Sequence, residues 1–269
     1  MKKTHRTDRA LTGRALTKNF GSVHALAGVD ITIPAGQTVA IMGPSGSGKS
    51  TLLHCLSGIL PPTSGEVMLG HSSVSGLSDA ARSRLRLTDF GFVFQDGQLI
   101  PELPARENVA LPLLLKGSSR RQALKTADDW LTRLGLAAEA RRRPGEMSGG
   151  QAQRVAIARA LAGSPAVVFA DEPTGALDQA TGHEVMQILT ATARMSGTTL
   201  VVVTHDTQVA AWCERLVEIR DGRIHADSAA DEQPQQPPVY YPNSSTPAYA
   251  ASMDAFYQEG ATYQNGGAR

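Results

Sequence analysis

Short apolar runs alternate with longer amphipathic stretches along residues 14–228. The runs at 166–170 and 200–203 are too short for helices and predict buried parallel strands. Three further strands are predicted at 31–33, 39–42 and 90–94. Strands that alternate with helices are typical of an α/β domain, which is the fold class that the pattern predicts.

Helical spacing dominates the middle of the chain. One face of a predicted helix carries four apolar residues, Leu124, Ala127, Leu131 and Leu134. A second helix is predicted at 151–161, and a third from about 48 to 57. The pattern therefore predicts a sheet-rich core that is interrupted by a helical insertion at about 96–165.

The two ends of the chain differ from this body. Residues 229–269 hold all five tyrosines, with five prolines and five glutamines, and Val239 is their only Val, Leu or Ile. Such a segment buries too little apolar area to offset the entropy of ordering, so we expect a disordered tail. It is either a dispensable extension or a docking segment for a partner. Residues 1–13, with Lys2 and Lys3 among them, are expected to form a flexible basic terminus.

Composition narrows the class of protein. Lys and Arg number 26 against 25 Asp and Glu, a net charge of +1, which offers no electrostatic footprint for nucleic acid. Two cysteines, Cys55 and Cys213, cannot build a disulfide scaffold. No apolar run approaches the ~18–20 residues that cross a bilayer, and the N-terminus lacks a secretory pattern. We expect a cytoplasmic protein that meets a membrane only through another chain.

A glycine-rich segment follows the predicted strand 39–42 and precedes a predicted helix. It matches the pattern GxxxxGK[ST] with Gly43, Pro44, Ser45, Gly46, Ser47, Gly48, Lys49, Ser50 and Thr51. Glycines let backbone N–H groups surround phosphate oxygens, and a helix N-terminus favours the anion. Lys49 places a charge against the terminal phosphates, and the Ser50 hydroxyl can ligate Mg²⁺. The segment predicts nucleoside triphosphate binding without choosing among kinases, GTPases and ATPases.

An acidic pair, Asp171 and Glu172, closes the predicted strand 166–170. The carboxyl end of such a strand lies beside the phosphate loop, so the Asp171 carboxylate is placed to contact Mg²⁺. Glu172 is placed to orient or deprotonate an attacking water. Alone, the pair is equally compatible with a helix cap before Pro173, and its combination with the phosphate loop favours the catalytic interpretation.

A second pair of glycines precedes the helix predicted at 151–161. Ser148 can cap this helix with Gln151 three residues later, and Gly149 and Gly150 leave backbone N–H groups approachable by a second anion. Here the sequence resembles the ATP-binding subunits of ABC transporters, whose signature is LSGGQ. Met147 stands where that family usually has Leu.

The resemblance covers about 16–226 and gives roles to further residues. It implies that Gln95 contacts Mg²⁺ and the attacking water, that Asp178 belongs to the D-loop, and that His205 contacts the γ-phosphate. Phe20 matches the aromatic residue that stacks on adenine, with an ordinary core phenylalanine as the alternative. The implied metal ligands are Ser50, Gln95 and Asp171, and the implied catalytic residues are Glu172, His205 and Gln95.

The resemblance also implies an architecture and partners. The architecture is a P-loop NTPase core with an ABC-type β-subdomain and a helical signature subdomain, over 14–228. Each ATP of a head-to-tail homodimer is held by one phosphate loop and capped by Ser148, Gly149 and Gly150 of the other subunit. ATP then switches the dimer between two states that drive a separate permease at the cytoplasmic face of the membrane. Permease helices are expected to engage the region from Gln95 to Leu115.

The subgroup is indicated by a set of segments. Residues 91–95, 101–103, 107–109, 111–113 and 171–178 resemble the lipoprotein-release, macrolide-efflux and antimicrobial-peptide group, whose partners are FtsX-like permeases. Residues 204–206 and 210–213 resemble the antimicrobial-peptide branch.

Two alternatives stay open. One is a soluble ABC-type ATPase acting on DNA, ribosomes or iron–sulfur assembly, against which stand the lack of sustained heptads, of a second cassette and of zinc cysteines. The other is a sensing module without transport, whose ATPase chemistry would be identical. The substrate and the direction of transport do not follow from the sequence.

Overall fold

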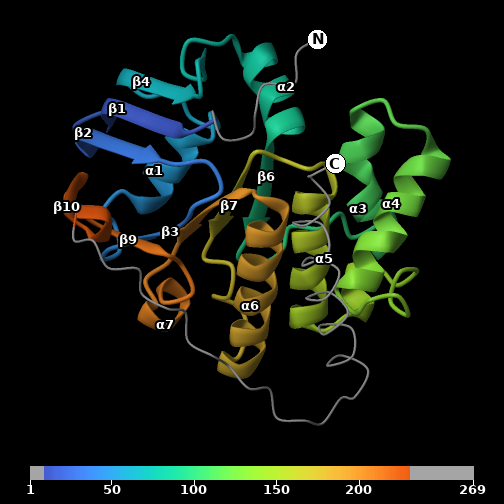
Figure 1. Ribbon diagram of the computed structural model, residues 1–269. Coiled ribbons are helices and arrows are strands. Elements are labelled where there is room, and N and C mark those ends of the chain that lie inside the picture. Colours follow the sequence, from blue (N-terminus) through green and yellow to red (C-terminus); the bar gives the residue numbers. More distant parts are fainter. Residues whose placement is uncertain (1–8, 231–269) are drawn as a thin grey trace, which may run out of the picture.

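The computed structural model describes residues 9–230, which form two sheets and the helices that pack on them (Figure 1). The larger sheet has six strands in the order β10-β9-β3-β8-β7-β6. They are β3 (Thr38–Met42), β6 (Phe90–Phe94), β7 (Val167–Asp171), β8 (Thr199–Val203), β9 (Arg215–Arg220) and β10 (Arg223–Asp227). All adjacent strands pair in parallel except β10, which pairs antiparallel with β9. The strands predicted at 39–42, 90–94, 166–170 and 200–203 are confirmed to within one residue at either end.

Seven α-helices accompany the two sheets in the described part of the chain. They are α1 (Lys49–Leu56), α2 (Asp79–Asp89), α3 (Ala105–Leu115), α4 (Arg120–Arg133), α5 (Gly149–Ala162), α6 (Gln179–Ser196) and α7 (Thr207–Ala210), with 3₁₀ turns at Pro144–Glu146 and Ser228–Ala230. We call α3, α4 and α5, which lie between β6 and β7, the helical arm. No helix within residues 9–230 is long and apolar enough to cross a bilayer.

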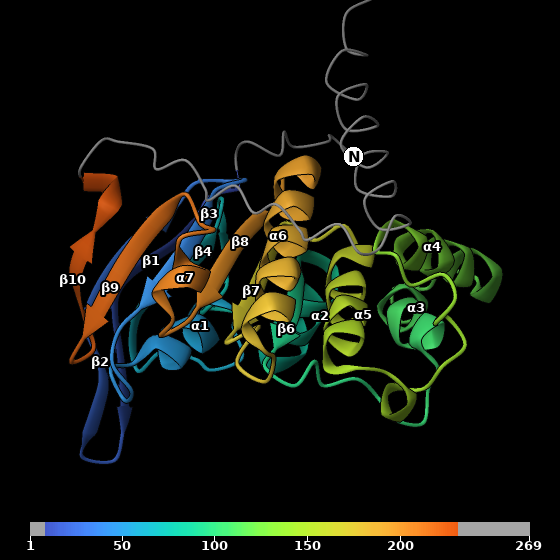
Figure 2. The ribbon, with the colours of Figure 1, turned by 90° about the horizontal axis from the view of Figure 1, so that it is seen from below.

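The smaller sheet is antiparallel, in the order β2-β1-β4-β5. Its strands are β1 (Leu11–Phe20), β2 (Val23–Ile33), β4 (Ser64–Leu69) and β5 (Ser72–Ser73). It lies at the opposite end of the molecule from α3 and α4, with the larger sheet between them (Figure 2). The strand predicted at 31–33 is the end of the much longer β2.

Alternate side chains of the larger sheet enter two separate cores. On β8, Leu200 and Val202 join the core shared with the helical arm, whereas Val201 and Val203 join the core shared with α1 and the smaller sheet. All four are fully buried. A strand that is buried on both faces appears in the sequence as a continuous apolar run, which explains why these strands could be predicted.

The expected boundary at residue 14 is wrong. β1 begins at Leu11, whose side chain is fully buried and which pairs with Ile33 on one side and Leu69 on the other. Residues 11–13 therefore belong to the smaller sheet. Pairing in this strand buries the apolar side chain of Leu11, which a flexible terminus would leave exposed to water. At the other end, Ser228–Ala230 forms a 3₁₀ turn that includes the first residues of the expected tail. The rest of that tail, 231–269, and residues 1–8 lie outside the described residues.

Both cysteines are buried. Cys55 lies on α1, and Cys213 lies just before β9. Burial raises the pKa of the Cys55 thiol to about 11 and that of Cys213 to about 12. Both side chains therefore stay protonated at neutral pH and act as small apolar groups.

Candidate nucleotide-binding site

The predicted phosphate loop connects β3 to α1. All three of its glycines have a positive φ, 151° at Gly43, 77° at Gly46 and 101° at Gly48. A Cβ atom at Gly43 would lie 2.1 Å from the Ile219 carbonyl oxygen, and one at Gly48 would lie 2.4 Å from that of Ala25. Only glycine fits at these two positions, because the loop passes directly against the backbone of β2 and β9.

The loop carries polar groups that suit an anion. Lys49 is 9% exposed, and its Nζ donates to the carbonyl oxygens of Gly43 and Pro44 at 2.8 and 2.9 Å. The Ser47 hydroxyl is buried with no hydrogen-bond partner within residues 9–230. The N-cap of α1 at Gly48 makes no side-chain capping bond. A buried hydroxyl and an uncapped helix N-terminus both gain from a ligand oxygen, so these residues fit a triphosphate.

Two of the three predicted metal ligands, Ser50 and Asp171, are in direct contact. The Ser50 hydroxyl donates to Oδ1 of Asp171 at 3.2 Å, joining α1 to the end of β7. Burial raises the pKa of the Asp171 carboxyl, and the Ser50 hydrogen bond opposes this effect. A hydroxyl beside a carboxylate is the oxygen pair that Mg²⁺ prefers, so the donor set fits that ion.

Gln95 directly follows β6 and lies beside the acidic pair Asp171 and Glu172. Phe94 pairs with Asp171 in the parallel register of β6 and β7, which places the next residues of both strands side by side. A Cβ atom at Gly175 would lie 3.0 Å from Nε2 of Gln95. The Gln95 side chain therefore points at the loop that follows Glu172.

Glu172 and His205 are in direct contact. His205 Nδ1 lies 2.8 Å from Oε1 of Glu172, and the Thr204 hydroxyl donates to Oε2 at 3.2 Å. Glu172 has a φ of 46°, a strained conformation for a residue with a side chain, and its backbone N–H donates to the Val203 carbonyl oxygen at 2.9 Å. Three partners from the end of β8 thus hold Glu172 in this conformation.

The glycine pair of α5 lies at a capped helix N-terminus. The Gln151 backbone donates to the Ser148 hydroxyl at 3.3 Å, and the Ser148 backbone donates to Oε1 of Gln151 at 3.0 Å. The predicted capping box is therefore confirmed. Gly150 is buried, and a Cβ atom there would lie 2.4 Å from Cγ2 of Thr181 on α6. Ser148 and Gly149 are exposed and leave their backbones approachable.

Asp178 caps α6 next to that helix end. Its Oδ1 accepts from the Thr181 backbone at 3.1 Å, and its Oδ2 accepts from the Thr181 hydroxyl at 2.7 Å. These hydrogen bonds lower the pKa of the Asp178 carboxyl. A Cβ atom at Gly149 would lie 3.1 Å from Cδ2 of Leu177. The predicted D-loop and the predicted signature segment of the same chain are therefore neighbours.

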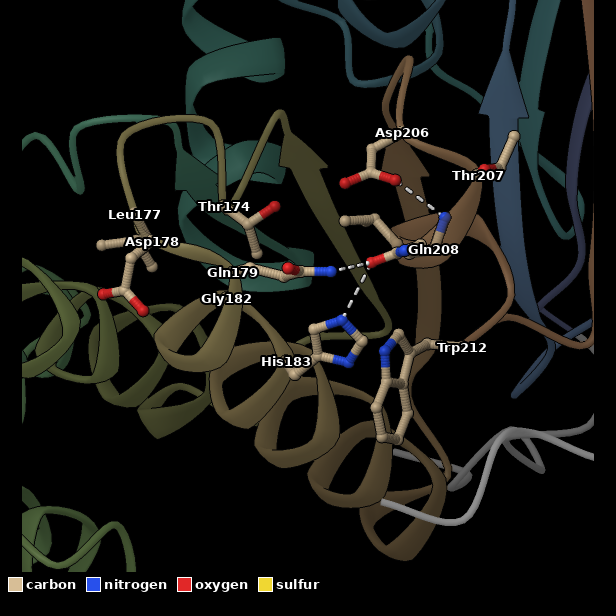
Figure 3. A pocket seen from close by; sticks show the side chains of 11 residues that line it. Thr174, Leu177, Asp178, Gln179, Gly182, His183, Asp206, Thr207, Gln208 and Trp212 are labelled. Carbon is tan, nitrogen blue, oxygen red and sulfur yellow. Dashed lines mark hydrogen bonds between the residues drawn. The ribbon is translucent and has the colours of Figure 1, made fainter. Parts of the chain in front are cut away.

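A polar cavity of about 430 Å³ lies between α6 and α7 (Figure 3). Asp178 and Asp206 both line it, so it adjoins the predicted D-loop and the loop of His205. Oε1 of Gln208 accepts from Nε2 of Gln179 at 2.8 Å and lies 3.2 Å from Nε2 of His183. This link between α6 and α7 was not predicted, since no local sequence pattern relates residues from two separate helices.

Phe20 lies at the end of β1 and is 49% exposed. The alternative of a core phenylalanine is therefore excluded. The Lys18 ammonium lies 5.2 Å from the centre of the ring, so the ring is held at the surface with a charged neighbour.

Known proteins match this chain over most of its length. Residues 26–175 match the model of the family described as ABC transporter. The chain is 47% identical over 216 residues to the lipoprotein-releasing system ATP-binding protein LolD of Geobacter metallireducens, covering 79% of this chain and 96% of that protein. It is 46% identical over 233 residues to the macrolide export ATP-binding/permease protein MacB of Nitrosomonas europaea, covering 85% of this chain and 35% of that protein.

A solved structure matches the fold. The chain aligns with the dimeric post-hydrolysis state of the ATP-binding cassette MJ0796 bound to ADP and Pi, at a TM-score of 0.75 and 40% identity, covering 84% of this chain and 99% of that one. The expected lipoprotein-release and macrolide-efflux group is thus confirmed, whereas the antimicrobial-peptide branch stays a prediction. The chain belongs to the ABC transporter family, as one of its ATP-hydrolysing nucleotide-binding cassettes.

Proposed function

We propose that this chain hydrolyses ATP as a head-to-tail homodimer and thereby drives a separate FtsX-like permease at the cytoplasmic face of the membrane. The observation that carries the proposal is the convergence of Lys49, Ser50, Asp171, Glu172 and His205 at the carboxyl ends of the parallel strands of the larger sheet. Ligands of open α/β sheets bind at this edge. The likeness to LolD over 96% of that protein supports a cassette that acts apart from its permease.

The phosphate loop and the metal ligands prepare the substrate. Lys49 exchanges the carbonyl oxygens that it now contacts for oxygens of the terminal phosphates. The Ser50 hydroxyl, the Asp171 carboxylate and the Gln95 amide oxygen would hold Mg²⁺, which would supply positive charge against the phosphate oxygens. Phe20 stacks its exposed ring on adenine.

Glu172 acts as the general base. Its carboxylate, oriented by His205 and Thr204, takes a proton from the attacking water. The water oxygen bonds to the γ-phosphorus while the bond from that phosphorus to the bridging oxygen of ADP breaks, which releases ADP and phosphate. The His205 side chain is 72% exposed and can contact the γ-phosphate from the same position.

The dimer completes the site. Ser148 and Gly149 are exposed, and their neighbours in the same chain are the residues around Asp178, not the phosphate loop. The N-terminus of α5 thus presents an anion site to a second subunit. A nucleotide held by the partner's phosphate loop would be capped there, as the dimeric state of MJ0796 supports by likeness.

A groove between the helical arm, α2 and β6 suits the permease. It encloses about 300 Å³ between α2, β6, α3 and α5, beside Leu115, which is 65% exposed. Three cations line it and donate to backbone carbonyls: Arg86, Lys116 and Arg159. The groove therefore fits a segment of the permease that carries apolar and acidic side chains. It overlaps the region from Gln95 to Leu115 that the family resemblance implies.

The Glu172→Gln variant tests the proposal. It should bind ATP but hydrolyse it at least about 100-fold more slowly, because the general base is lost, and should accumulate as a dimer in ATP. Dimerisation is measured by light scattering, and partners are identified by mass spectrometry after purification from gently solubilised membranes in ATP. The matched control is Lys49→Ala, which should stay monomeric.

Recovery of an integral membrane protein with the Glu172→Gln variant would support the permease proposal. A monomer in ATP, wild-type turnover, or recovery of ribosomal or DNA-bound proteins without a permease would each contradict it.

A further inference from the structure

One buried side chain joins three of the motifs described above. Gln153 lies on α5, five residues after Ser148, and is 2% exposed. Its Nε2 donates to the Phe94 carbonyl oxygen at 2.9 Å and to the Pro173 carbonyl oxygen at 2.7 Å. Both donors of a buried amide are therefore used by backbone groups from two other parts of the chain.

The two acceptors directly adjoin catalytic groups. Phe94 precedes Gln95, and Pro173 follows Glu172. Because each carbonyl belongs to the backbone of the loop that carries a catalytic group, Gln153 fixes both loops relative to α5.

A second residue of α5 strengthens the link on the side of Gln95. The Arg159 guanidinium donates to the carbonyl oxygens of Gly97 and Gln98, each at 2.7 Å. The helix also packs directly on β6, since a Cβ atom at Gly91 would lie 2.4 Å from the Ala160 carbonyl oxygen. α5 therefore holds the segment that contains Gln95 at both its ends.

We propose that Gln153 is a positioning residue that couples the two ATP sites of the dimer. The proposal rests on the head-to-tail dimer of the proposed function. The N-terminus of α5 caps the ATP held by the partner subunit, whereas Gln95 and Glu172 act on the ATP held by their own phosphate loop. Gln153 joins this helix to both loops, so occupancy of one site sets the geometry of the catalytic groups at the other.

The physical reason is that breaking the two Gln153 hydrogen bonds costs free energy. A buried carbonyl oxygen that loses its donor is costly, and no water replaces a donor at a side chain 2% exposed. A shift of α5 is therefore passed on to the Phe94 and Pro173 carbonyls. Energetic coupling of this kind between two sites produces cooperativity in ATP concentration.

The test is the Gln153→Met variant, which keeps the length of the side chain and removes both donors. The rate of ATP hydrolysis is measured against ATP concentration. We expect wild type to have a Hill coefficient between one and two, the limit for two sites. In Gln153→Met the Hill coefficient should fall to one, and kcat should fall by about ten-fold or more with misplacement of the base. The ATP concentration at half-maximal rate should change by less than about three-fold, because the phosphate loop is untouched.

The matched control is Asn108→Leu. Asn108 is fully buried on α3, and its amide nitrogen donates to the carbonyl oxygens of Ile100 and Leu103. It is an equally buried amide that adjoins no catalytic group, so kcat and the Hill coefficient should both stay at wild-type values. Gln153→Met behaving like wild type, or both variants losing activity in step with a shared fall in Tm, would overturn the role of Gln153.

A second measurement separates this inference from the proposed function. Glu172→Gln and Glu172→Gln/Gln153→Met should dimerise equally in ATP when followed by light scattering, because neither phosphate loop nor signature segment is altered. A double variant that stays monomeric would mean that Gln153 assembles the dimer face, which overturns a positioning role. A monomeric Glu172→Gln would instead overturn the dimer itself.

Discussion

The edge of the larger sheet and the helical arm hold their functional residues by different means. At the sheet edge, Asp171 and Glu172 continue β7, whose side chains are fully buried up to Ala170 and whose neighbours pair on both sides. On the arm, Ser148 begins a helix that is joined to the sheet by packing and by single polar side chains such as Gln153. The backbone pairing of the sheet positions the residues at its edge. Individual side-chain hydrogen bonds, each of which one substitution can remove, position the residues on the arm.

The helical arm is itself compact. Small side chains let its helices approach closely, and Ala105, Ala110, Ala123 and Ala127 are all fully buried. The Arg106 guanidinium also pairs with Asp128 at 2.7 Å, joining α3 to α4. The two regions therefore differ in how they are held: the catalytic groups adjoin the strands of the sheet, whereas the arm packs as a compact unit that is joined to them through α5.

The largest effect should come from removing the charge at the sheet edge. Lys49→Ala should weaken ATP binding by about 2–5 kcal/mol, the usual result of truncating one partner of a buried charge-assisted contact. Calorimetric titration with ATP measures it. Lys125→Ala, an exposed lysine on α4, is the control and should bind as wild type does. Unchanged affinity in Lys49→Ala would remove the sheet edge as the phosphate site.

A smaller effect should come from weakening the ion pair between Arg215 on β9 and Asp227 on β10. Arg215 is 8% exposed and pairs with both oxygens of Asp227, and it donates to the Thr32 carbonyl oxygen at 2.6 Å. The Arg215 hydrogen bonds lower the pKa of the Asp227 carboxyl. The Arg215–Asp227 pair therefore stabilises the fold at pH values above the ordinary Asp pKa of about 4. This stabilisation is lost as the pH falls through the lowered pKa of Asp227.

Asp227→Asn should accordingly lower the free energy of unfolding by about 1–3 kcal/mol at pH 7, with the difference from wild type shrinking in acid. Urea unfolding at a series of pH values measures both quantities. Glu218→Gln is the control, because Glu218 pairs with the more exposed Arg220. A pH-independent difference would contradict the role of the charge, and a changed ATP affinity in folded Asp227→Asn would show that the Arg215–Asp227 pair also affects the phosphate site.

The smallest effect should come from deleting 229–269. Every residue proposed to act on ATP lies within 20–205, so the ATPase rate should stay within about two-fold of wild type, as is usual for changes at a terminus. Steady-state hydrolysis and the yield of folded protein are measured together. A large loss of folded protein would show that the tail supports one of the two regions.

Elements with a continuous apolar run or a local capping pattern could be predicted from the sequence, whereas elements and contacts without either could not. Strands β7 and β8 are apolar without interruption because both faces are buried, and the capping box at Ser148 is a local pattern. The helix α2 was missed because no residue on it is buried, which leaves no apolar face to recognise. The contacts of Gln153 could not be predicted, since they join it to residues 59 and 20 positions away in the chain.

The smaller sheet was predicted only in part for a related reason. The buried residues of β2 are Leu26, Val29, Ile31 and Ile33. Exposed or half-buried residues separate them, and the first residues of the strand are exposed. A half-exposed antiparallel strand has a weak apolar signal, so only 31–33 was recognised. The start of β1 at Leu11 depended on its partners Ile33 and Leu69, which a reading along the chain does not bring together.

The burial of Cys55 and Cys213 has a practical consequence for measuring motion. They are the only cysteines of the chain, and maleimide dyes react with thiolates, which both side chains scarcely form at neutral pH. A cysteine introduced at the exposed Arg121 on α4 and another at the exposed Val23 on β2 would therefore carry the dyes without removal of the native ones. Fluorescence energy transfer between them would follow the arm against the sheet in otherwise unaltered protein, one nucleotide state at a time.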